Sequence, residues 1–302
     1  MKVFITGAAG FVGRAVTTEL ISHGHTVVGL CRSETSASTV KALGAEIHWG
    51  DIEDLPSLTR ALAPEHKVDG VVHLAFTMDF SDFPRACSID RTAIQTMAEA
   101  LKGSGKPLVM TSGTLLLPDR ADGVDEATEV DREGFLAVRA QSEDLIKNLS
   151  SELGVRGCVV RLAPVVHGEE DKGFVPMLGD LARKNGFVAY LNSGGPYRWP
   201  AVHRRDAAAL FRLVLEKGKP GKVYHGVAEE GVDLKGLMEG IGKRMGLPLE
   251  GKSQEEIGRL LGFFAGLVGR DNFVRSTKTR EELGWMAGRE GLLEDIERNY
   301  FQ

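Results

Sequence analysis

Three glycines near the start of the chain, Gly7, Gly10 and Gly13, have the spacing of a loop that binds a diphosphate. Residues 3–5 in front of them are typical of a buried strand, and residues 11–22 have the apolar period of a helix. At such a turn the glycines permit a tight bend, a close approach to pyrophosphate and close helix packing, while the helix N-terminus attracts the anion. The residues expected to bind a dinucleotide here are Gly7, Gly10, Phe11, Val12 and Gly13.

The end of the second expected strand, residues 25–31, indicates which dinucleotide binds. An NAD site commonly has an acid there for the ribose 2′-hydroxyl, whereas an NADP site has arginine and small hydroxyl residues for a 2′-phosphate. Cys31 stands where the acid is expected, and Arg32 and Ser33 follow it. These residues favour NADP(H) over NAD(H), although Glu34 can still serve a ribose and Arg32 can be a plain exposed residue.

Asp51 and Ile52 come directly after the third expected strand, residues 45–49. A carboxylate at this strand end can accept a hydrogen bond from the amino group of adenine. A helix is expected to follow from residue 55, so Asp51 can equally be its N-cap and need no ligand. Both interpretations stay open.

Hydroxyl and imidazole groups at two further strand ends are candidate catalysts. Ser112 and Thr114 flank Gly113 just past the fifth expected strand, at the edge where ligands bind in parallel sheets. Either hydroxyl can bond a substrate carbonyl, or the four residues from 111 can form an ordinary turn. His167 follows the sixth expected strand, and a histidine can give or take a proton near neutral pH.

Four other side chains are weaker candidates for proton transfer. Tyr190 and Tyr197 are second choices, on a glycine-rich loop expected to cover the pocket. His73 lies in an apolar strand and is expected to be a core histidine with satisfied hydrogen bonds. His203 is expected to help seat the helix that begins near Asp206.

Strands and helices alternate strictly through the first half of the chain. The expected strands are 3–5, 25–31, 45–49, 68–75, 107–111 and 157–162, and the expected helices are 11–22, 36–43, 55–62, 82–101 and 131–153. Parallel neighbours need helical crossovers, so this alternation predicts an α/β fold with a doubly wound parallel sheet. Ligands then lie at the carboxyl ends of the strands, which is where the residues above are found.

The alternation of strands and helices changes after Pro164, and two regions are expected. Residues 1–167 and about 200–227 would form the NADP-binding Rossmann domain, with a helix at 206–216 and a strand at 222–227. About 168–199 and 228–302 would form a smaller substrate-binding region. Residues 278–283 before Gly284 are expected to be a terminal helix with its glycine cap.

Composition excludes several other classes of protein. The 302 residues carry a formal charge of -5, so no basic field is present to hold nucleic acid or an anionic membrane. Met1 and Lys2 lead directly into the first strand, and no apolar run has the length of a membrane span, so a cytoplasmic protein is expected. The three cysteines and eight histidines lack metal-ligand spacing. We expect no metal, a small-molecule substrate, and a monomer or homodimer.

Taken together, these motifs resemble the extended short-chain dehydrogenase/reductases, above all the epimerase/dehydratase-like group and its atypical members. The matching segments are the glycine loop and residues 32–33, 50–52, 73–75, 111–114, 199–203 and 206–208. The resemblance covers nearly the whole chain and implies a Rossmann domain that carries NAD(P), with a C-terminal substrate region. It also implies that Ala75 and Phe76 line the cofactor and that Pro164 to His167 border the nicotinamide.

The chain departs from the catalytic pattern of that family, which pairs a tyrosine acid with a lysine four residues later. Phe135 and Arg139 keep the spacing, but phenylalanine cannot transfer a proton. Arg139 can still hold ribose hydroxyls as a cation. Alternatively, Arg139 and Glu143 are simply an ion pair on a helix surface, at i and i+4.

These features predict an NADP-dependent oxidoreductase that acts on a carbonyl or alcohol of a small, fairly hydrophobic molecule, with an atypical proton donor. The alternative is a non-redox isomerase, lyase or cyclase, or a nucleotide-sensing regulator, on the same fold. The arginines at 198, 204 and 205 leave a nucleotide sugar as an alternative substrate, because they could bind its diphosphate. The side chains expected around the substrate are Phe76, Met78, Phe80, Phe83, Leu115, Leu116, Phe174, Met177 and Trp199.

Overall fold

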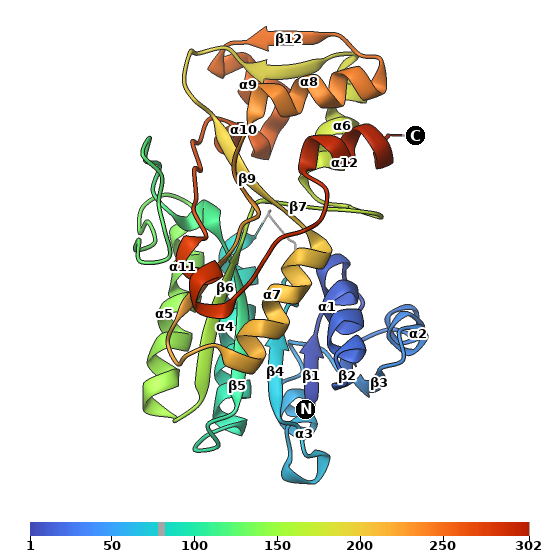
Figure 1. Ribbon diagram of the computed structural model, residues 1–302, viewed down its shortest axis with the longest axis vertical. Helices are drawn as coiled ribbons and strands as arrows, with labels where there is room; N and C mark the ends of the chain where they lie inside the picture. The colour runs from blue at the N-terminus through green and yellow to red at the C-terminus, as the bar shows by residue number, and fades with distance from the viewer. Residues whose placement is uncertain (78–81, 302) are drawn as a thin grey trace.

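The computed structural model describes residues 1–77 and 82–301 and has two lobes, one above the other in Figure 1. The larger, the sheet lobe, is built on seven parallel strands in the order β10-β6-β5-β4-β1-β2-β3. Their bounds are β1 Lys2–Thr6, β2 Thr26–Cys31, β3 Glu46–Trp49, β4 Gly70–His73, β5 Pro107–Gly113, β6 Arg156–Leu162 and β10 Val223–Gly226. The predicted doubly wound α/β fold is confirmed.

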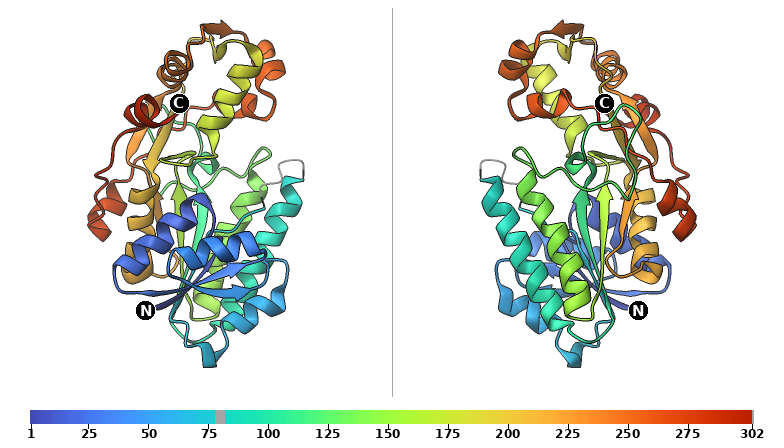
Figure 2. Two further views of the ribbon diagram at one scale, coloured as in Figure 1. Left: turned by 90° about the vertical axis from the view of Figure 1, so that its right-hand side faces the viewer. Right: turned by 90° about the vertical axis from the view of Figure 1, so that its left-hand side faces the viewer.

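Helices cover both faces of this sheet, because each crossover between parallel strands must return over one face. On one face lie α1 Phe11–Ser22, α2 Glu34–Ala42 and α7 Arg204–Lys217. On the other lie α3 Leu55–Ala61, α4 Phe83–Ala100 and α5 Ala137–Glu152. Short 3-10 helices occur at η1 Pro64–His66, η2 Thr114–Leu116 and η3 Gly262–Phe264. Both layers are visible in Figure 2.

Helix α5 is shorter at its start than the sequence predicts. The sequence predicts a helix from residue 131, but α5 begins at Ala137. Gly134 adopts a left-handed backbone with φ of 73°, which a helix cannot contain. Phe135 therefore lies in the turn before the helix rather than on it.

The smaller lobe contains a two-stranded parallel sheet and five helices. Its elements are α6 Phe174–Asn185, β8 Val188–Leu191, α8 Leu234–Met245, β12 Leu249–Lys252, α9 Gln254–Leu261, α10 Ala265–Val268 and α12 Leu292–Asn299. A three-stranded sheet of β7 Val165–His167, β9 Arg198–His203 and β11 Glu229–Asp233 lies between the lobes (Figure 1). Apolar side chains from the five helices and both lobe strands form one core.

The C-terminal part of the chain contributes to both lobes. Helix α11, Thr277–Leu283, ends at Gly284 in a left-handed conformation, as predicted, but α12 follows it. Leu283 and Trp285 pack into the core of the sheet lobe, and Trp285 Nε1 donates to the Asp206 carbonyl at 2.9 Å. Residues after 228 are therefore not confined to the smaller lobe. Among the described helices, none has the length and apolarity needed to cross a membrane.

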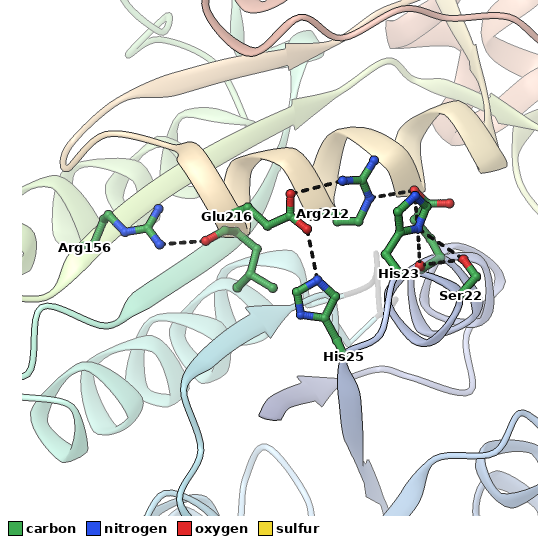
Figure 3. A network of polar contacts seen from close by, with 8 residues as sticks. Ser22, His23, His25, Arg156, Arg212 and Glu216 are labelled. Carbon is green, nitrogen blue, oxygen red and sulfur yellow. Dashed lines mark hydrogen bonds and ion pairs between the residues drawn. The ribbon is translucent and has the colours of Figure 1, made fainter. Parts of the chain in front are cut away.

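A network of charged side chains holds α7 against α1 and the start of β2 (Figure 3). Arg212 Nε donates to Glu19 at 2.8 Å, and Nη1 donates to Glu216 at 3.0 Å. Glu216 also lies 3.0 Å from His25 Nε2. These contacts fix the helix that carries the glycine loop at its N-terminus.

Candidate active site

The glycine loop has the geometry of a cradle for a diphosphate. Gly7 has φ of 74°, and a Cβ on Gly13 would lie 2.0 Å from the Gly7 carbonyl oxygen. A Cβ on Gly10 would lie 3.1 Å from the same oxygen. Helix α1 has no side-chain cap and no acid in its first turn, so its first N–H groups face outward for an anion. The loop therefore fits a dinucleotide phosphate.

The end of β2 presents a cation where the adenosine ribose of a dinucleotide would lie. Cys31 is fully buried, whereas the Arg32 side chain is 79% exposed and its Nη1 lies 3.6 Å from Asp51 Oδ2. Ser33 caps α2, with its Oγ accepting from the Ser36 N–H at 3.3 Å. An exposed arginine beside a helix N-cap suits a phosphate group better than a hydroxyl.

Asp51 is not the N-cap that the sequence left open. Asp54 caps α3, and its Oδ1 accepts from the Ser57 N–H at 3.3 Å. Asp51 lies three residues before that cap, where its Oδ1 accepts from the Glu53 N–H at 3.0 Å. Ile52 beside it is buried. The adenine role of this pair stays a prediction.

An apolar pocket of about 180 Å³ opens between the two lobes, at the carboxyl ends of β4 and β5. It is lined by Phe76, Phe83, Gly113, Leu115, Leu116, Leu136, Arg139, Phe174 and Leu267. Five of the expected substrate-contacting side chains are among them. Trp199 is instead fully buried in the core and Met177 is 38% exposed. Met78 and Phe80 lie outside the described residues.

Arg139 is the charged side chain in the lining of this pocket. Its Nη1 forms an ion pair with Asp90 Oδ2 and lies 3.3 Å from Ser142 Oγ, and Nη2 donates to the Thr111 carbonyl at 2.7 Å. The guanidinium carbon lies 4.6 Å from the centre of the Phe76 ring. A guanidinium has five N–H groups, so two are left without a hydrogen bond in the described part of the chain.

Asp90 on α4 is buried behind Arg139 and was missed by the sequence analysis. Its side chain is 1% exposed, and its Oδ2 also accepts from Ser142 Oγ at 2.9 Å. Burial alone raises the pKa of Asp90, but Arg139 and His73 outweigh it and hold the pKa below its usual range. A signal was present, because residue 90 falls on the same helical face as the buried Ala86 and Ala93.

His73 at the end of β4 continues this buried chain of polar groups toward the glycine loop. Its Nδ1 lies 2.6 Å from Thr6 Oγ1, which also accepts from the Ala75 N–H at 3.2 Å. Its Nε2 lies 3.3 Å from Asp90 Oδ1, without a hydrogen bond. The prediction that His73 is a buried core residue is therefore right, whereas the prediction that its hydrogen bonds are all satisfied is wrong for Nε2.

Glu143 does not pair with Arg139, so the alternative of an ion pair on the surface of α5 is wrong. Glu143 is fully buried and binds Arg161 on β6, with Nη2 at 2.7 Å from Oε2 and Nε at 2.9 Å from Oε1. Ser112 Oγ donates to Glu143 Oε1 at 2.6 Å. Burial raises the pKa of Glu143, yet the hydrogen bond and charge of Arg161 hold it below its ordinary value.

The two hydroxyls expected to meet a substrate both have buried protein partners. Ser112 is engaged by Glu143. Thr114 is fully buried, and its Oγ1 donates to Asn272 Oδ1 at 2.7 Å, while Asn272 Nδ2 donates back to the Thr114 carbonyl at 2.9 Å. Gly113 between them lines the pocket. The end of β5 reaches the pocket, as its position predicts. The residue that lines the pocket there is Gly113, and neither Ser112 nor Thr114 belongs to the lining.

The other predicted proton donors lie apart from this pocket lining. His167 is 1% exposed, and its Nδ1 lies 2.6 Å from Asp295 Oδ2 on α12. His203 caps α7, where its Nδ1 accepts from the Arg205 N–H at 3.2 Å, as its expected structural role requires. Tyr190 and Tyr197 line a different pocket, beside β8 and the start of α8.

Phe135 stands at the position expected for the tyrosine but does not line the pocket. It is 52% exposed, and its ring centre lies 6.2 Å from that of Phe83, which does. Leu136 takes the place in the lining. No side-chain hydroxyl, imidazole or carboxylate belongs to the lining formed by the described residues.

The arginines that kept a nucleotide-sugar substrate open all have carboxylate partners. Arg198 binds Asp271 through two nitrogens, at 2.8 Å and 2.6 Å. Arg204 and Arg205 both lie 3.0 Å from Glu169. Asp271 compensates the charge of Arg198, whereas Arg204 and Arg205 share the single carboxylate of Glu169.

The whole chain has known relatives. The sequence model of the NAD dependent epimerase/dehydratase family matches residues 3–225. An uncharacterized protein of Saccharomyces cerevisiae is 44% identical over 307 residues, with 99% of each chain covered. The 4-hydroxy-2-methyl-3-oxo-4-farnesyl-3,4-dihydroquinoline-1-oxide ketoreductase of Stigmatella aurantiaca is 26% identical and covers 96% of this chain and 92% of its own.

A solved structure shows the same fold. The UDP-glucose 4-epimerase of Thermus thermophilus, in complex with NAD, is 18% identical, with a TM-score of 0.78. The match covers 98% of this chain and 97% of the epimerase. At this identity the likeness shows the arrangement of the elements and does not carry over the substrate.

Proposed function

Because this chain belongs to the NAD-dependent epimerase/dehydratase family, we propose that it is an NADP-dependent oxidoreductase of the short-chain dehydrogenase/reductase type. Its substrate is a small, fairly hydrophobic molecule with a carbonyl or alcohol group. The observation that carries this proposal is the apolar pocket between the lobes, at whose wall Asp90 and the Thr111 carbonyl hold the guanidinium of Arg139.

The cofactor would be held along the carboxyl ends of the central strands. Gly7, Gly10 and Gly13 with the N–H groups of Phe11 and Val12 would hold the diphosphate. The remaining assignments are Arg32 and Ser33 for the 2′-phosphate, Asp51 and Ile52 for adenine, and Ala75, Phe76, Pro164 and His167 for the nicotinamide side. The exposed Arg32 supports NADP(H), since its guanidinium is available to a phosphate.

Walls of leucine and phenylalanine support an apolar substrate, because a polar molecule would lose its hydration there without replacement. The volume of about 180 Å³ is below the roughly 300–1,000 Å³ of sites for drug-sized ligands, so the part of the substrate that enters is small. The ketoreductase relative from Stigmatella aurantiaca, whose name describes a farnesylated ketone, agrees with this chemistry.

Arg139 would act as a hydrogen-bond donor to the reacting oxygen. The reduced cofactor, when bound, supplies a hydride. Negative charge then develops on the carbonyl oxygen, and a guanidinium already fixed by Asp90 and the Thr111 carbonyl can stabilise it without reorganising. A guanidinium keeps its protons near neutral pH, so the proton comes from water. Ser112, Thr114 and His167 would support the strand ends from behind, through their buried partners.

The test is a direct measurement with the purified protein. We expect NADPH to bind more tightly than NADH, and NADPH to be consumed with at least some members of a panel of small apolar aldehydes and ketones. Calorimetry gives the two affinities, and NADPH absorbance gives the turnover. Absence of both binding and turnover across the panel would refute the proposal.

One observation favours a second candidate, a non-redox isomerase, lyase or cyclase, or a nucleotide-sensing regulator. The described pocket lining contains no group of the tyrosine type that could give up a proton. The parent protein discriminates the two, because Phe135 lies outside the pocket and a tyrosine there would not reach the substrate. Consumption of NADPH with a carbonyl compound of the panel supports the first candidate, and NADPH binding without consumption across the panel supports the second.

A further inference from the structure

We propose that Asp90 determines the charge of the substrate: by compensating Arg139, it makes the apolar pocket a site for neutral carbonyl compounds and excludes apolar carboxylates. This inference rests on the proposed function in one respect, because it takes the pocket lined by Arg139 as the place of the substrate. Asp90 itself does not line the pocket and acts through Arg139.

The geometry gives Arg139 a single fixed position. Asp90 holds Nη1 from α4, the Thr111 carbonyl holds Nη2 from β5, and the Phe76 ring lies against the guanidinium face. The Arg139 side chain is 12% exposed and that of Asp90 is 1% exposed. The outward field of this ion pair falls off faster with distance than that of a lone cation, because the charge of Asp90 opposes that of Arg139.

A ligand that enters the pocket therefore meets apolar side chains and an arginine whose charge is compensated. A ketone or aldehyde has no charge to desolvate among these side chains, so it can enter at a small cost. A carboxylate would lose its hydration among Leu115, Leu136 and other apolar side chains. In the described lining no uncompensated cation could offset this cost by forming an ion pair.

The relatives make the inference specific to this chain. The name of the Thermus thermophilus enzyme says that it acts on UDP-glucose, a nucleotide sugar. Here the arginine in the described lining of the pocket, Arg139, is compensated by Asp90. This compensation favours a neutral molecule.

Benzylacetone and hydrocinnamate test this directly, because they differ only in carrying a methyl group or an oxygen anion on the same carbonyl carbon. We expect the wild type at neutral pH to bind benzylacetone at least about tenfold more tightly than hydrocinnamate. In Asp90→Asn the positive charge of Arg139 is released, and hydrocinnamate should gain about 10- to 100-fold while benzylacetone changes little. Ligand-observed NMR measures both affinities, with and without NADP⁺.

Ser142→Ala is the matched control, because it removes a neutral partner of both Asp90 and Arg139 and leaves the charges in place. It should keep the wild-type preference. Equal binding of the two probes by the wild type overturns the inference, as does a folded Asp90→Asn variant that gains no affinity for hydrocinnamate. If Asp90→Asn does not fold, Asp90→Ser, which also removes the negative charge, makes the same comparison.

The outcome separates this inference from the proposed function. Ligand binding is measured without turnover, so a preference for benzylacetone in a protein that consumes no NADPH would sustain the pocket chemistry and refute the oxidoreductase. Displacement of benzylacetone by NADP⁺ would assign the pocket to the cofactor and overturn the inference.

Discussion

Helix α5 carries two charged residues one turn apart, Arg139 and Glu143, and they lie in different surroundings. Glu143 faces inward and binds Arg161 of β6, and both side chains are at most 1% exposed. Arg139 binds Asp90 of α4 and is 12% exposed at the wall of the pocket. The first pair is enclosed by protein on every side; the second has N–H groups left over.

The difference lies in how completely each guanidinium is used. Arg161 bonds Glu143 through two nitrogens, donates to the Thr128 carbonyl at 3.1 Å and approaches His225 Nε2 at 3.4 Å. A buried arginine whose three nitrogens all have partners holds elements together. A partly used one at a cavity can bind a ligand without changing its own position. The same chemical pair is thus a structural support at one site and a candidate binding group at the other.

The largest expected effect comes from breaking the enclosed pair. Glu143→Gln leaves the charge of Arg161 buried and unpaired, so the free energy of unfolding should fall by about 3–5 kcal/mol. Urea denaturation measures it. Asp144→Asn on the next residue is the control, because the Arg132–Asp144 pair is exposed and should contribute at most about 1 kcal/mol. Equal losses in the two variants would contradict the distinction.

Breaking the pocket pair should instead appear in catalysis. Arg139→Gln removes the guanidinium that Asp90 and the Thr111 carbonyl hold in place, and we expect turnover to fall by about 10²- to 10³-fold, as for loss of an oxyanion donor. Its loss of stability should be smaller than that of Glu143→Gln, because Asp90 keeps His73 beside it at 3.3 Å. Steady-state kinetics with NADPH and the best ketone of the panel measures it. Unchanged turnover would exclude Arg139 from the reaction.

We expect acid to lower the stability of the folded protein through His225, which lies beside the enclosed pair of Glu143 and Arg161. This ring is fully buried, and burial, with a smaller contribution from the charge of Arg161, lowers its pKa from 6.5 to about 4. In the unfolded chain His225 therefore takes up a proton below about pH 6.5, whereas in the folded chain it takes one up only near pH 4. Stability falls as pH falls through this window. The free energy of unfolding should fall by about 3 kcal/mol, because each unit of pKa difference corresponds to about 1.4 kcal/mol.

His225→Asn should flatten that part of the stability curve, because asparagine keeps a donor near the Arg275 carbonyl and has no charge to gain. Thermal unfolding at a series of pH values measures the slope. His66→Asn, at an exposed histidine, should leave the wild-type slope unchanged. A slope that survives in His225→Asn would assign the acid sensitivity to other groups.

The sequence predicts the parts of the molecule that local patterns determine. The glycine turn, the alternation of strands and helices and the cap at Gly284 depend on neighbours within a few residues, and the structure has them. The partners of Arg139 and Glu143 depend on segments far away, at Asp90 and Arg161. A spacing of four residues suggested a pair on one helix, and only tertiary packing could assign each residue to a different neighbour.

An exposed pair completes the series with the smallest expected effect. Arg32 is 79% exposed and lies 3.6 Å from Asp51, so Arg32→Ala should change the free energy of unfolding by at most about 0.5 kcal/mol. NADPH affinity should nevertheless fall about tenfold, because a charge-assisted bond to the 2′-phosphate is lost, while NADH affinity stays the same. Arg60→Ala, which breaks the similarly exposed pair with Asp54 at 3.7 Å, should leave both affinities unchanged. Equal weakening of NADPH and NADH by Arg32→Ala would remove the argument for NADP, since a cation that reads the 2′-phosphate must distinguish the two cofactors.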